Sequence, residues 1–229
     1  MSAMNTQFSQ FVVNKPAGGD ALVKSGRSTI YSSPGDQAFF AAIDTYLVDT
    51  TWVHQLSWEN NTDAAQTYAH QYTTELKVTK GTEVTVSVSI GAEFKGLSIG
   101  IEGSTKTFST YETTSSQTKT LTVNVPPHKK VTFYQRQYTF TNKMFFILDA
   151  WNEEWNAGSP GGYDITRKEC TVHIMSEDYL TTETELSNGA VGTIQVDTVR
   201  RANHEGDRKT RKRENLTGRA KDELSKMGV

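Results

Sequence analysis

The sequence predicts a mainly antiparallel β protein, and three observations lead to that fold class. Between residues 73 and 124, 20 of the 52 residues are Ser or Thr, with no Pro among them. They are interleaved with Val, Ile and Leu, which is typical of strands, whereas a mucin-like stalk would also carry Pro. Apolar and polar residues alternate over residues 76–90 and 97–101, and aromatic residues fill 131–140, as expected of half-buried strands.

The first regular element is expected to be a short N-terminal helix that begins at Ser33-Pro34. Pro is favoured at the first helical position, and five apolar side chains follow at helical spacing. Strands are expected next from Trp52 to Trp58 and from Tyr68 to Val78, separated by a turn at residues 60–63. The five side chains of the expected helix are Phe39, Phe40, Ile43, Tyr46 and Leu47.

A β-hairpin is expected over about residues 82–105, because two alternating arms flank a Gly-bounded turn at residues 91–96. Each arm has about ten residues, which matches the ~9–11 residues of a tilted transmembrane strand. A hairpin with one face on a core and one in water would show the same alternation, so both interpretations stay open. The apolar, potentially lipid-facing side comprises Val84, Val86, Val88, Ile90, Phe94, Leu97, Ile99 and Ile101, and the potential lumen side comprises Thr85, Ser87, Ser89, Ser98 and Gly100.

Charge and composition exclude several classes of protein. The net charge is −2, which excludes nucleic-acid binding by bulk electrostatics, and the single cysteine, Cys170, excludes an intramolecular disulfide. No apolar run reaches the ~20 residues of a membrane-spanning helix, and no secretory signal is visible. We therefore expect a protein that is soluble as made. Cytoplasmic storage or unconventional release would precede any action on a target membrane.

Catalytic motifs are absent from the sequence. It contains no G-x-S-x-G elbow, H-E-x-x-H pair or P-loop, and its five histidines are scattered. Asp149, Glu153 and Glu154 lie near Trp151 and Trp155, and paired carboxylates beside aromatic rings would suit a glycosidase. Solvated loop acids are the commoner reason for such a group. We expect no enzyme, no cofactor and no metal ion, and a buried, inert Cys170.

A Gly- and Pro-rich loop carries three aromatic residues that are candidates for receptor binding: Trp151, Trp155 and Tyr163. Such side chains suit stacking on sugars or contact with the lipid interface, but packing on the core is an equal alternative. The tail, residues 200–229, has a net charge of +5 against −7 for the rest of the chain. Its run Arg211, Lys212 and Arg213 is a candidate processing site, although a nuclear-type cluster or a solvated run would look the same. A helix near the end of the tail could be docked, marginal or disordered.

Several of these motifs occur in the order typical of one family. Trp58-Glu59-Asn60-Asn61-Thr62-Asp63 and Gln66-Thr67-Tyr68 precede the alternating hairpin, and Thr122-Val123-Asn124-Val125-Pro126-Pro127-His128-Lys129-Lys130-Val131 follows it. In this order the chain resembles the aerolysin-type β-pore-forming proteins, particularly small members without a lectin domain, such as hydralysin-like or fungal cytolysins. The resemblance covers roughly residues 55–145.

The resemblance implies an elongated, twisted antiparallel sheet and a cytolytic, for example hemolytic, toxin. Such a protein would bind a lipid or glycan receptor and form a ring of about seven or eight protomers. Each protomer would insert one hairpin into a transmembrane barrel. The resemblance also implies three parts of the chain: a surface-binding part (1–70), a pore-forming module (71–199) and the basic tail (200–229). The basic tail departs from the family pattern, and we expect it to restrain assembly until it is cleaved. The alternative is a non-lytic carbohydrate- or surface-binding protein of lectin type.

Overall fold

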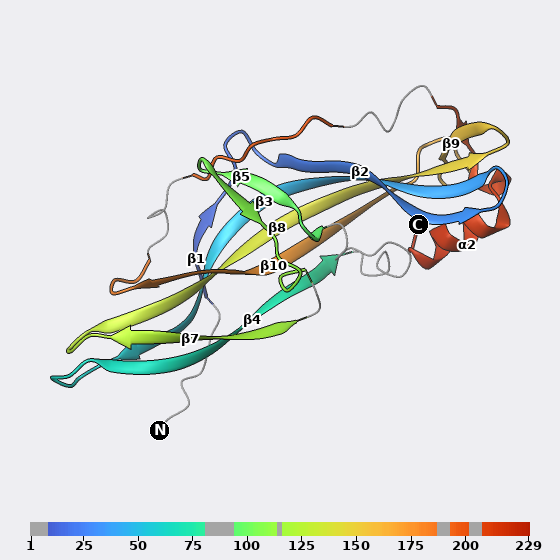
Figure 1. Cartoon of the computed structure of the whole chain (residues 1–229). Coiled ribbons are helices and arrows are strands. Elements are labelled where there is room, and N and C mark those ends of the chain that lie inside the picture. The colour runs from blue at the N-terminus through green and yellow to red at the C-terminus, as the bar shows by residue number, and fades with distance from the viewer. Residues whose placement is uncertain (1–8, 81–93, 114–115, 187–192, 202–207) are drawn as a thin grey trace.

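The structure is a computed structural model that describes residues 9–80, 94–113, 116–186, 193–201 and 208–229. Figure 1 shows a long, twisted sheet with a short helix at one end. The strands are β1 (Ser9–Asn14), β2 (Ala21–Ser33), β3 (Gln37–Glu59), β4 (Gln66–Lys80), β5 (Ser98–Ile101), β6 (Ser104–Thr107), β7 (Gln117–Val125), β8 (Lys130–Ala150), β9 (Glu153–Ala157), β10 (Arg167–Thr182) and β11 (Thr210–Arg211). The 3₁₀ turn η2 (Arg213–Asn215) and the helix α2 (Gly218–Lys226) follow.

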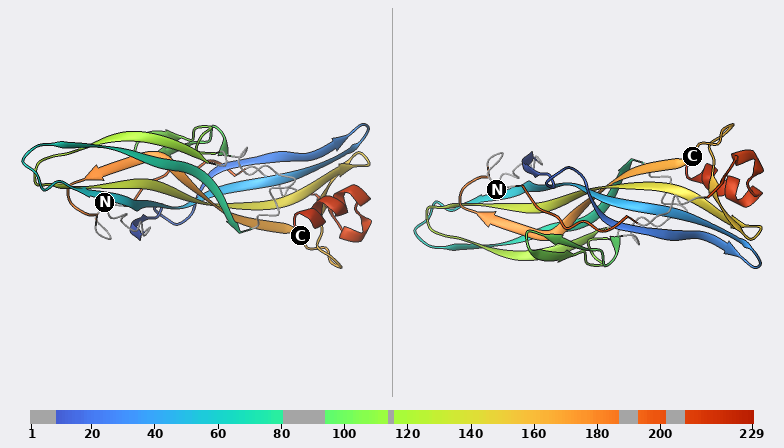
Figure 2. Two further views of the ribbon diagram at one scale, coloured as in Figure 1. Left: turned by 90° about the horizontal axis from the view of Figure 1, so that it is seen from below. Right: turned by 90° about the horizontal axis from the view of Figure 1, so that it is seen from above.

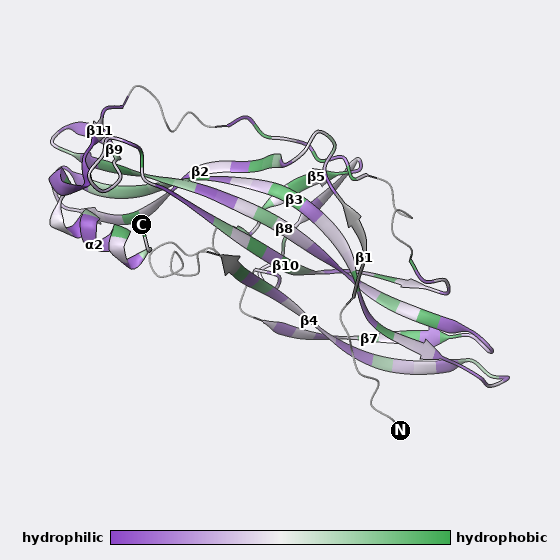
Figure 3. Cartoon of the chain, turned by 180° about the vertical axis from the view of Figure 1, so that it is seen from behind, coloured by the Kyte–Doolittle hydropathy of each residue, from purple (hydrophilic) through white to green (hydrophobic). Residues whose placement is uncertain are grey.

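The main sheet has nine strands, and its continuous path is β1-β3-β8-β10-β4-β7. β2 pairs with the first half of β3 and β1 with the second half. β3 and β8 have 23 and 21 residues and pair antiparallel from end to end, so the sheet is about 70 Å long. Figure 3 shows both hydrophilic and hydrophobic residues along these long strands. The expected elongated, mainly antiparallel β fold is confirmed.

β4 changes its neighbour along its length. Residues 75–80 pair with β10, whereas residues 66–74 pair with β7. Figure 2 shows β4 and β7 extending beside the rest of the sheet at the end opposite to α2, where Trp58 and Tyr68 pack against a small cluster of valines. β4 passes through residue 70, the position at which the sequence places the boundary between the surface-binding part and the pore-forming module. The sheet is therefore continuous across that position.

The short N-terminal helix expected at residues 34–47 is wrong. Pro34 lies in the loop between β2 and β3, where Gly35 adopts a φ of 97°, and residues 37–59 form β3. The sequence signal misleads because both faces of β3 are covered. Phe39 and Ile43 belong to the main core, while Ala42 packs in a second cluster on the opposite face. With apolar residues on both faces, the period of two disappears and helical spacing arises by chance.

The main core lies on one face of the sheet, beneath the β5–β6 hairpin and α2. Its floor is formed by β3, β8 and β10, with Phe140, Phe146 and Ile174 fully buried. Leu224 of α2 and Met227, the residue that follows α2, are also fully buried in this core, so the tail helix is docked. Cys170 is buried as expected, and its burial raises the pKa of the thiol to about 11.

The docking of α2 predicts a specific loss of stability. Replacing Leu224 by Ala removes a fully buried side chain and should lower the free energy of unfolding by about 2–5 kcal/mol. Urea unfolding followed by tryptophan fluorescence measures the change. Asp222→Ala, on the exposed side of the same helix, is the matched control and should change stability by less than about 0.5 kcal/mol. Equal effects of the two substitutions would show that the helix does not contribute to the core.

Candidate functional site

The segment that contains the expected second hairpin arm forms a two-stranded sheet of its own. β5 and β6 pair antiparallel, and the turn between them is Glu102-Gly103, with φ of 51° and 78°. Two consecutive positive φ values are what a two-residue type I′ turn requires. The second arm, expected to run from Gly96 to Thr105, therefore turns back after Ile101 in this structure. Gly103, directly after the alternating residues, is the sequence signal for this turn.

β5 is amphipathic in the way the alternation predicts. Its apolar side chains, together with Phe94 and Leu97, are buried in the main core, whereas Ser98 is exposed and Gly100 half-exposed. Phe94 and Phe108 both pack on Phe140 of β8, with ring centroids 4.9 and 5.6 Å apart. The first-arm candidates Val84, Val86, Val88, Ile90, Thr85, Ser87 and Ser89 lie outside the described residues.

The outer edge of β5 is covered by an extended segment, residues 194–197. Ile101 and Val196 form an antiparallel bridge, flanked by hydrogen bonds from Glu102 N to Gln195 O and from Asp197 N to Gly100 O, both 3.1 Å. A Cβ on Gly100 would lie 2.1 Å from the Asp197 carboxylate, so a larger residue at this position would require the Asp197 side chain to move.

The segment that covers β5 is tied to the main sheet further along the chain. Val199 N donates to Leu22 O of β2 at 2.9 Å. Arg201 Nε lies 2.5 Å from the buried carboxylate of Asp44 on β3. The edge cover of β5 is thus fastened to β2 and β3.

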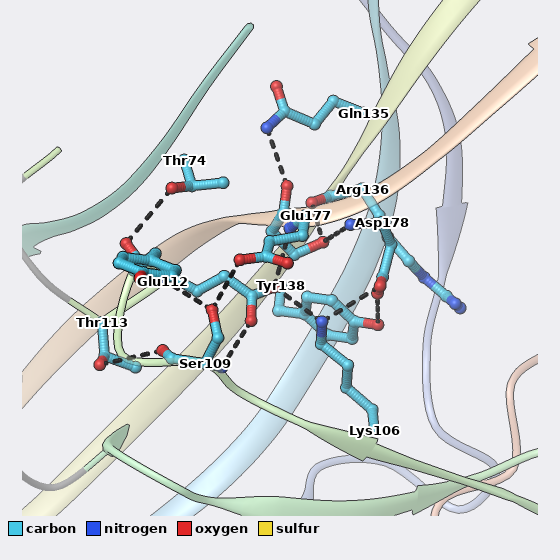
Figure 4. Close-up of polar contacts among 12 residues, drawn as sticks. Thr74, Lys106, Ser109, Glu112, Thr113, Gln135, Arg136, Tyr138, Glu177 and Asp178 are labelled. Atoms are coloured by element: carbon cyan, nitrogen blue, oxygen red, sulfur yellow. Dashed lines mark hydrogen bonds and ion pairs between the residues drawn. The ribbon is translucent and has the colours of Figure 1, made fainter. Parts of the chain in front are cut away.

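A buried ion pair holds β6 to β10. Lys106 Nζ lies 2.7 Å from Glu112 Oε1 and 3.1 Å from Asp178 Oδ1, and Figure 4 shows these groups pointing toward one another. Glu112 is only 1% exposed. The backbone N–H groups of Ser109 and Glu177 each donate to its carboxylate at 2.7 Å. Removing these partners would leave a buried carboxylate uncompensated, which is strongly destabilising.

β10 presents the acidic partners through an irregularity in its pairing. The register of β10 on β8 shifts between Met175 and Tyr179, which turns the side chains of Glu177 and Asp178 toward β6. Asp178 also accepts a hydrogen bond from Tyr138 at 2.7 Å, and burial raises the pKa of that phenol far above its usual value. Burial alone would raise the pKa of Glu177, but hydrogen bonds from Lys119 and Ser109 bring it below its ordinary value.

At the other end of the sheet, the β8–β9 hairpin displays Trp151 on a two-residue turn. Ala150 pairs with Glu153, and Trp151 and Asn152 between them have φ of 59° and 56°. These are the left-handed values of a type I′ turn, which normally favours Asn and Gly. Trp151 is 51% exposed.

The three candidate receptor residues contact the candidate processing residues. The guanidinium carbon of Arg211 lies 4.2 Å from the ring centroid of Trp151 and 4.1 Å from that of Trp155. Lys212 Nζ lies 4.6 Å from the ring centroid of Tyr163, which is 69% exposed. These are cation–π distances. Two groups of residues some fifty positions apart in the sequence therefore form one surface, which we call the aromatic–cation cluster.

Backbone pairing places the tail at this cluster. β11 runs parallel to β9, and Gly158 N donates to Arg211 O at 2.9 Å. Arg213 turns away from the aromatic rings and donates to Ser225 Oγ of α2 at 2.9 Å. The sequence carries no signal for this pairing, because β11 has only two residues and no alternation.

One of the carboxylates beside the two tryptophans, Glu154, forms two ion pairs. Glu154 lies 2.8 Å from Arg27 and 2.7 Å from Arg208, and the hydrogen bond from Arg27 is the main reason that its pKa is lowered. Burial raises the pKa of the neighbouring Asp149. Glu154 thus joins the tail to β2.

The described residues contain neither a membrane-spanning helix nor a cluster of metal ligands. None of the helices in this part of the chain is long and apolar enough to cross a bilayer. Within the same residues, no group of three or more His, Cys, Asp or Glu side chains could hold a metal ion.

Comparison with known proteins gives two matches among solved structures. No family model and no curated protein matches the chain. The chain is similar to the oligomeric pore-forming toxin pro-Monalysin, with 13% identity, a TM-score of 0.43 and coverage of 73% of this chain and 71% of that one. It is also similar to the parasporin-2 toxin of Bacillus thuringiensis, with 14% identity, a TM-score of 0.19 and coverage of 71% and 77%.

The buried ion pair predicts a local change when its cation is removed. Lys106→Met leaves Glu112 buried without its cation and should destabilise the packing of β6 by about 3 kcal/mol. Amide hydrogen exchange over residues 98–107 should then accelerate well beyond that of β3 and β8. Lys119→Met, which removes the more exposed partner of Glu177, is the control and should cost less than about 1 kcal/mol. Unchanged exchange in Lys106→Met would show that the ion pair does not hold the hairpin.

Proposed function

We propose that this chain perforates membranes. It binds a cell surface, assembles into a ring and inserts one amphipathic hairpin per protomer, built from about residues 82–105, into a transmembrane β-barrel. The main support for this proposal is that β5 and β6 are separate from the main sheet. They form a two-stranded sheet that is not part of the nine-stranded sheet, so they can leave without breaking any of its ladders.

The amphipathic pattern of β5 suits both environments. In the soluble protein, Leu97, Ile99 and Ile101 are buried on the core, and in a bilayer the same side chains would face lipid, which is equally apolar. Their transfer therefore involves little change in hydrophobic free energy. The backbone groups of an inserted strand need partners, and a closed barrel of several hairpins provides them.

Two changes must accompany insertion. The Glu102-Gly103 turn must open so that residues 96–105 extend into a strand of about ten residues, the length that a tilted strand needs to cross a bilayer. The Lys106–Glu112–Asp178 ion pair and the bridge from Ile101 to Val196 must also break. Neither belongs to a regular ladder of the main sheet, which supports their role as restraints on the soluble form.

The aromatic–cation cluster is proposed as the surface-binding site, with the exposed rings of Trp151 and Tyr163 as its contacts. The same exposure would equally serve the alternative function, a non-lytic carbohydrate- or surface-binding protein. Release of dye from liposomes distinguishes the two, because a protein of that kind would bind without leakage.

The tail is proposed as a restraint on surface binding and assembly. Arg211 and Lys212 lie against the aromatic rings of the proposed binding site, and Arg213 bonds to Ser225 of α2. Cleavage between Arg200 and Arg213 would cut the chain before or within this contact. Leu224 of α2 is buried in the main core. After cleavage, the tail would therefore still have to dissociate from the core.

A disulfide across the outer edge of β5 should block the pore. Ile101 and Val196 form a bridge flanked by two hydrogen bonds, and opposite residues of this kind have Cα atoms ~4.5 Å apart, close enough for a disulfide. Oxidised Ile101→Cys/Val196→Cys protein should release no dye from liposomes, and reduction should restore leakage.

The single variant Ile101→Cys, treated with the same oxidant, is the control and should leak in both states. The native Cys170 is buried and should not exchange with the new pair. Undiminished leakage from protein with a complete crosslink would contradict the insertion of β5.

Charge on the two faces of the first arm should have opposite consequences. Val86→Lys would place a charge on the lipid face, at a cost of about 2–4 kcal/mol per protomer near the middle of the bilayer, and should reduce dye release strongly. Ser87→Lys would face the water-filled lumen and should leave release nearly unchanged. Equal effects of the two substitutions on dye release would refute the assigned register.

A further inference from the structure

Two indole rings converge on a single cation at the end of the β8–β9 hairpin. Arg211 is within 4.2 Å of both ring centroids, those of Trp151 and Trp155. Among the described residues, no carboxylate forms an ion pair with Arg211, so the rings are the main partners of its charge. Aromatic faces arranged in this way around a positive charge are the recognised means of binding quaternary ammonium groups.

The guanidinium of Arg211 does not satisfy all of its hydrogen-bond donors beside the two indole rings. Arg211 Nε and Trp155 Nε1 are both buried, and neither has a hydrogen-bond partner in the part of the chain that the structure describes. A buried N–H without an acceptor is unfavourable. A quaternary ammonium ion carries the same charge but has no N–H group, so it would occupy the space between the rings without adding an unsatisfied donor.

The position of Trp151 adds a second, independent observation. Its φ of 59° places a bulky side chain in a left-handed conformation that usually belongs to Asn or Gly. Unusual backbone conformations of this kind concentrate at functional sites. The ring is 51% exposed, so a ligand can reach it from solvent.

We propose that Trp151 and Trp155 form a binding site for a quaternary ammonium group, and that Arg211 of the tail occupies it as an internal substitute. The ligand chemistry is that of choline, either free or as the headgroup of a phosphatidylcholine membrane. This deepens the proposed surface binding and rests on it only for the membrane as the source of the ligand. The tail would then restrain surface binding because its Arg211 competes with the ligand for this one site.

Choline binding tests the site without any membrane. The full-length Arg211→Gln variant keeps most of the side-chain volume but removes the competing cation. Titration with choline chloride, followed by tryptophan fluorescence, should show binding about tenfold tighter than to the parent protein. Sodium chloride at the same ionic strength should give no such change.

Two controls connect the signal to the rings. Lys209→Gln removes an exposed cation of the same tail, outside the aromatic–cation cluster, and should leave choline affinity at the parent level. Arg211→Gln/Trp151→Ala should lose the binding that Arg211→Gln gains. Equal melting temperatures of Arg211→Gln and the parent would show that the tail remains docked. If they differ, excess choline should displace Arg211 in the parent protein and shift its fluorescence in the same direction.

Vesicles identify the source of the ligand. Arg211→Gln should sediment with phosphatidylcholine vesicles more than with phosphatidylglycerol vesicles, and binding of free choline alone would assign the site to a soluble amine. Absence of choline binding to a folded Arg211→Gln variant, or binding that survives Trp151→Ala, would overturn the proposal. Dye release is measured separately, so a protein that binds choline but does not leak would contradict only the pore.

Discussion

The packing of residues 94–108 on the aromatic side chains of β8 is the contact that keeps the apolar face of β5 buried. The ring of Phe108 lies 5.1 Å from that of Tyr138 and 5.6 Å from that of Phe140, and Phe94 lies 4.9 Å from Phe140. These contacts cover the apolar face of a strand that would otherwise be exposed to water. In this structure the amphipathic segment therefore keeps its apolar face away from water.

The contact itself is apolar, whereas the Lys106–Glu112–Asp178 ion pairs beside it are polar. A buried ion pair loses its benefit once one partner moves, because the other charge is left desolvated. The Lys106–Glu112–Asp178 group should therefore release β6 in a cooperative manner. At the opposite end of the molecule, the aromatic–cation cluster would bind the surface. The proposed function would thus separate surface recognition from insertion along a sheet about 70 Å long.

The alternation of apolar and polar residues in β5 could be predicted from the sequence, but the tertiary contacts of these and other residues could not. The apolar positions Leu97, Ile99 and Ile101 are all buried, as a period of two requires. The same reasoning failed at residues 37–47, where two buried faces removed the period. It also could not place Arg211 against Trp151 and Trp155, because that contact depends on a two-residue parallel pairing and on the docking of α2. Contacts formed by tertiary packing leave no local pattern in the chain.

In the proposed function, the apolar face of β5 leaves the protein core and enters lipid. Single cysteines at positions 98 and 99, labelled with an environment-sensitive fluorophore, measure this most directly in the presence of liposomes. Insertion of β5 predicts that the probe at 99 is quenched by a lipid-attached quencher and the probe at 98 by aqueous iodide. Quenching of both probes by iodide alone, on protein that has bound the liposomes and released their dye, would contradict it.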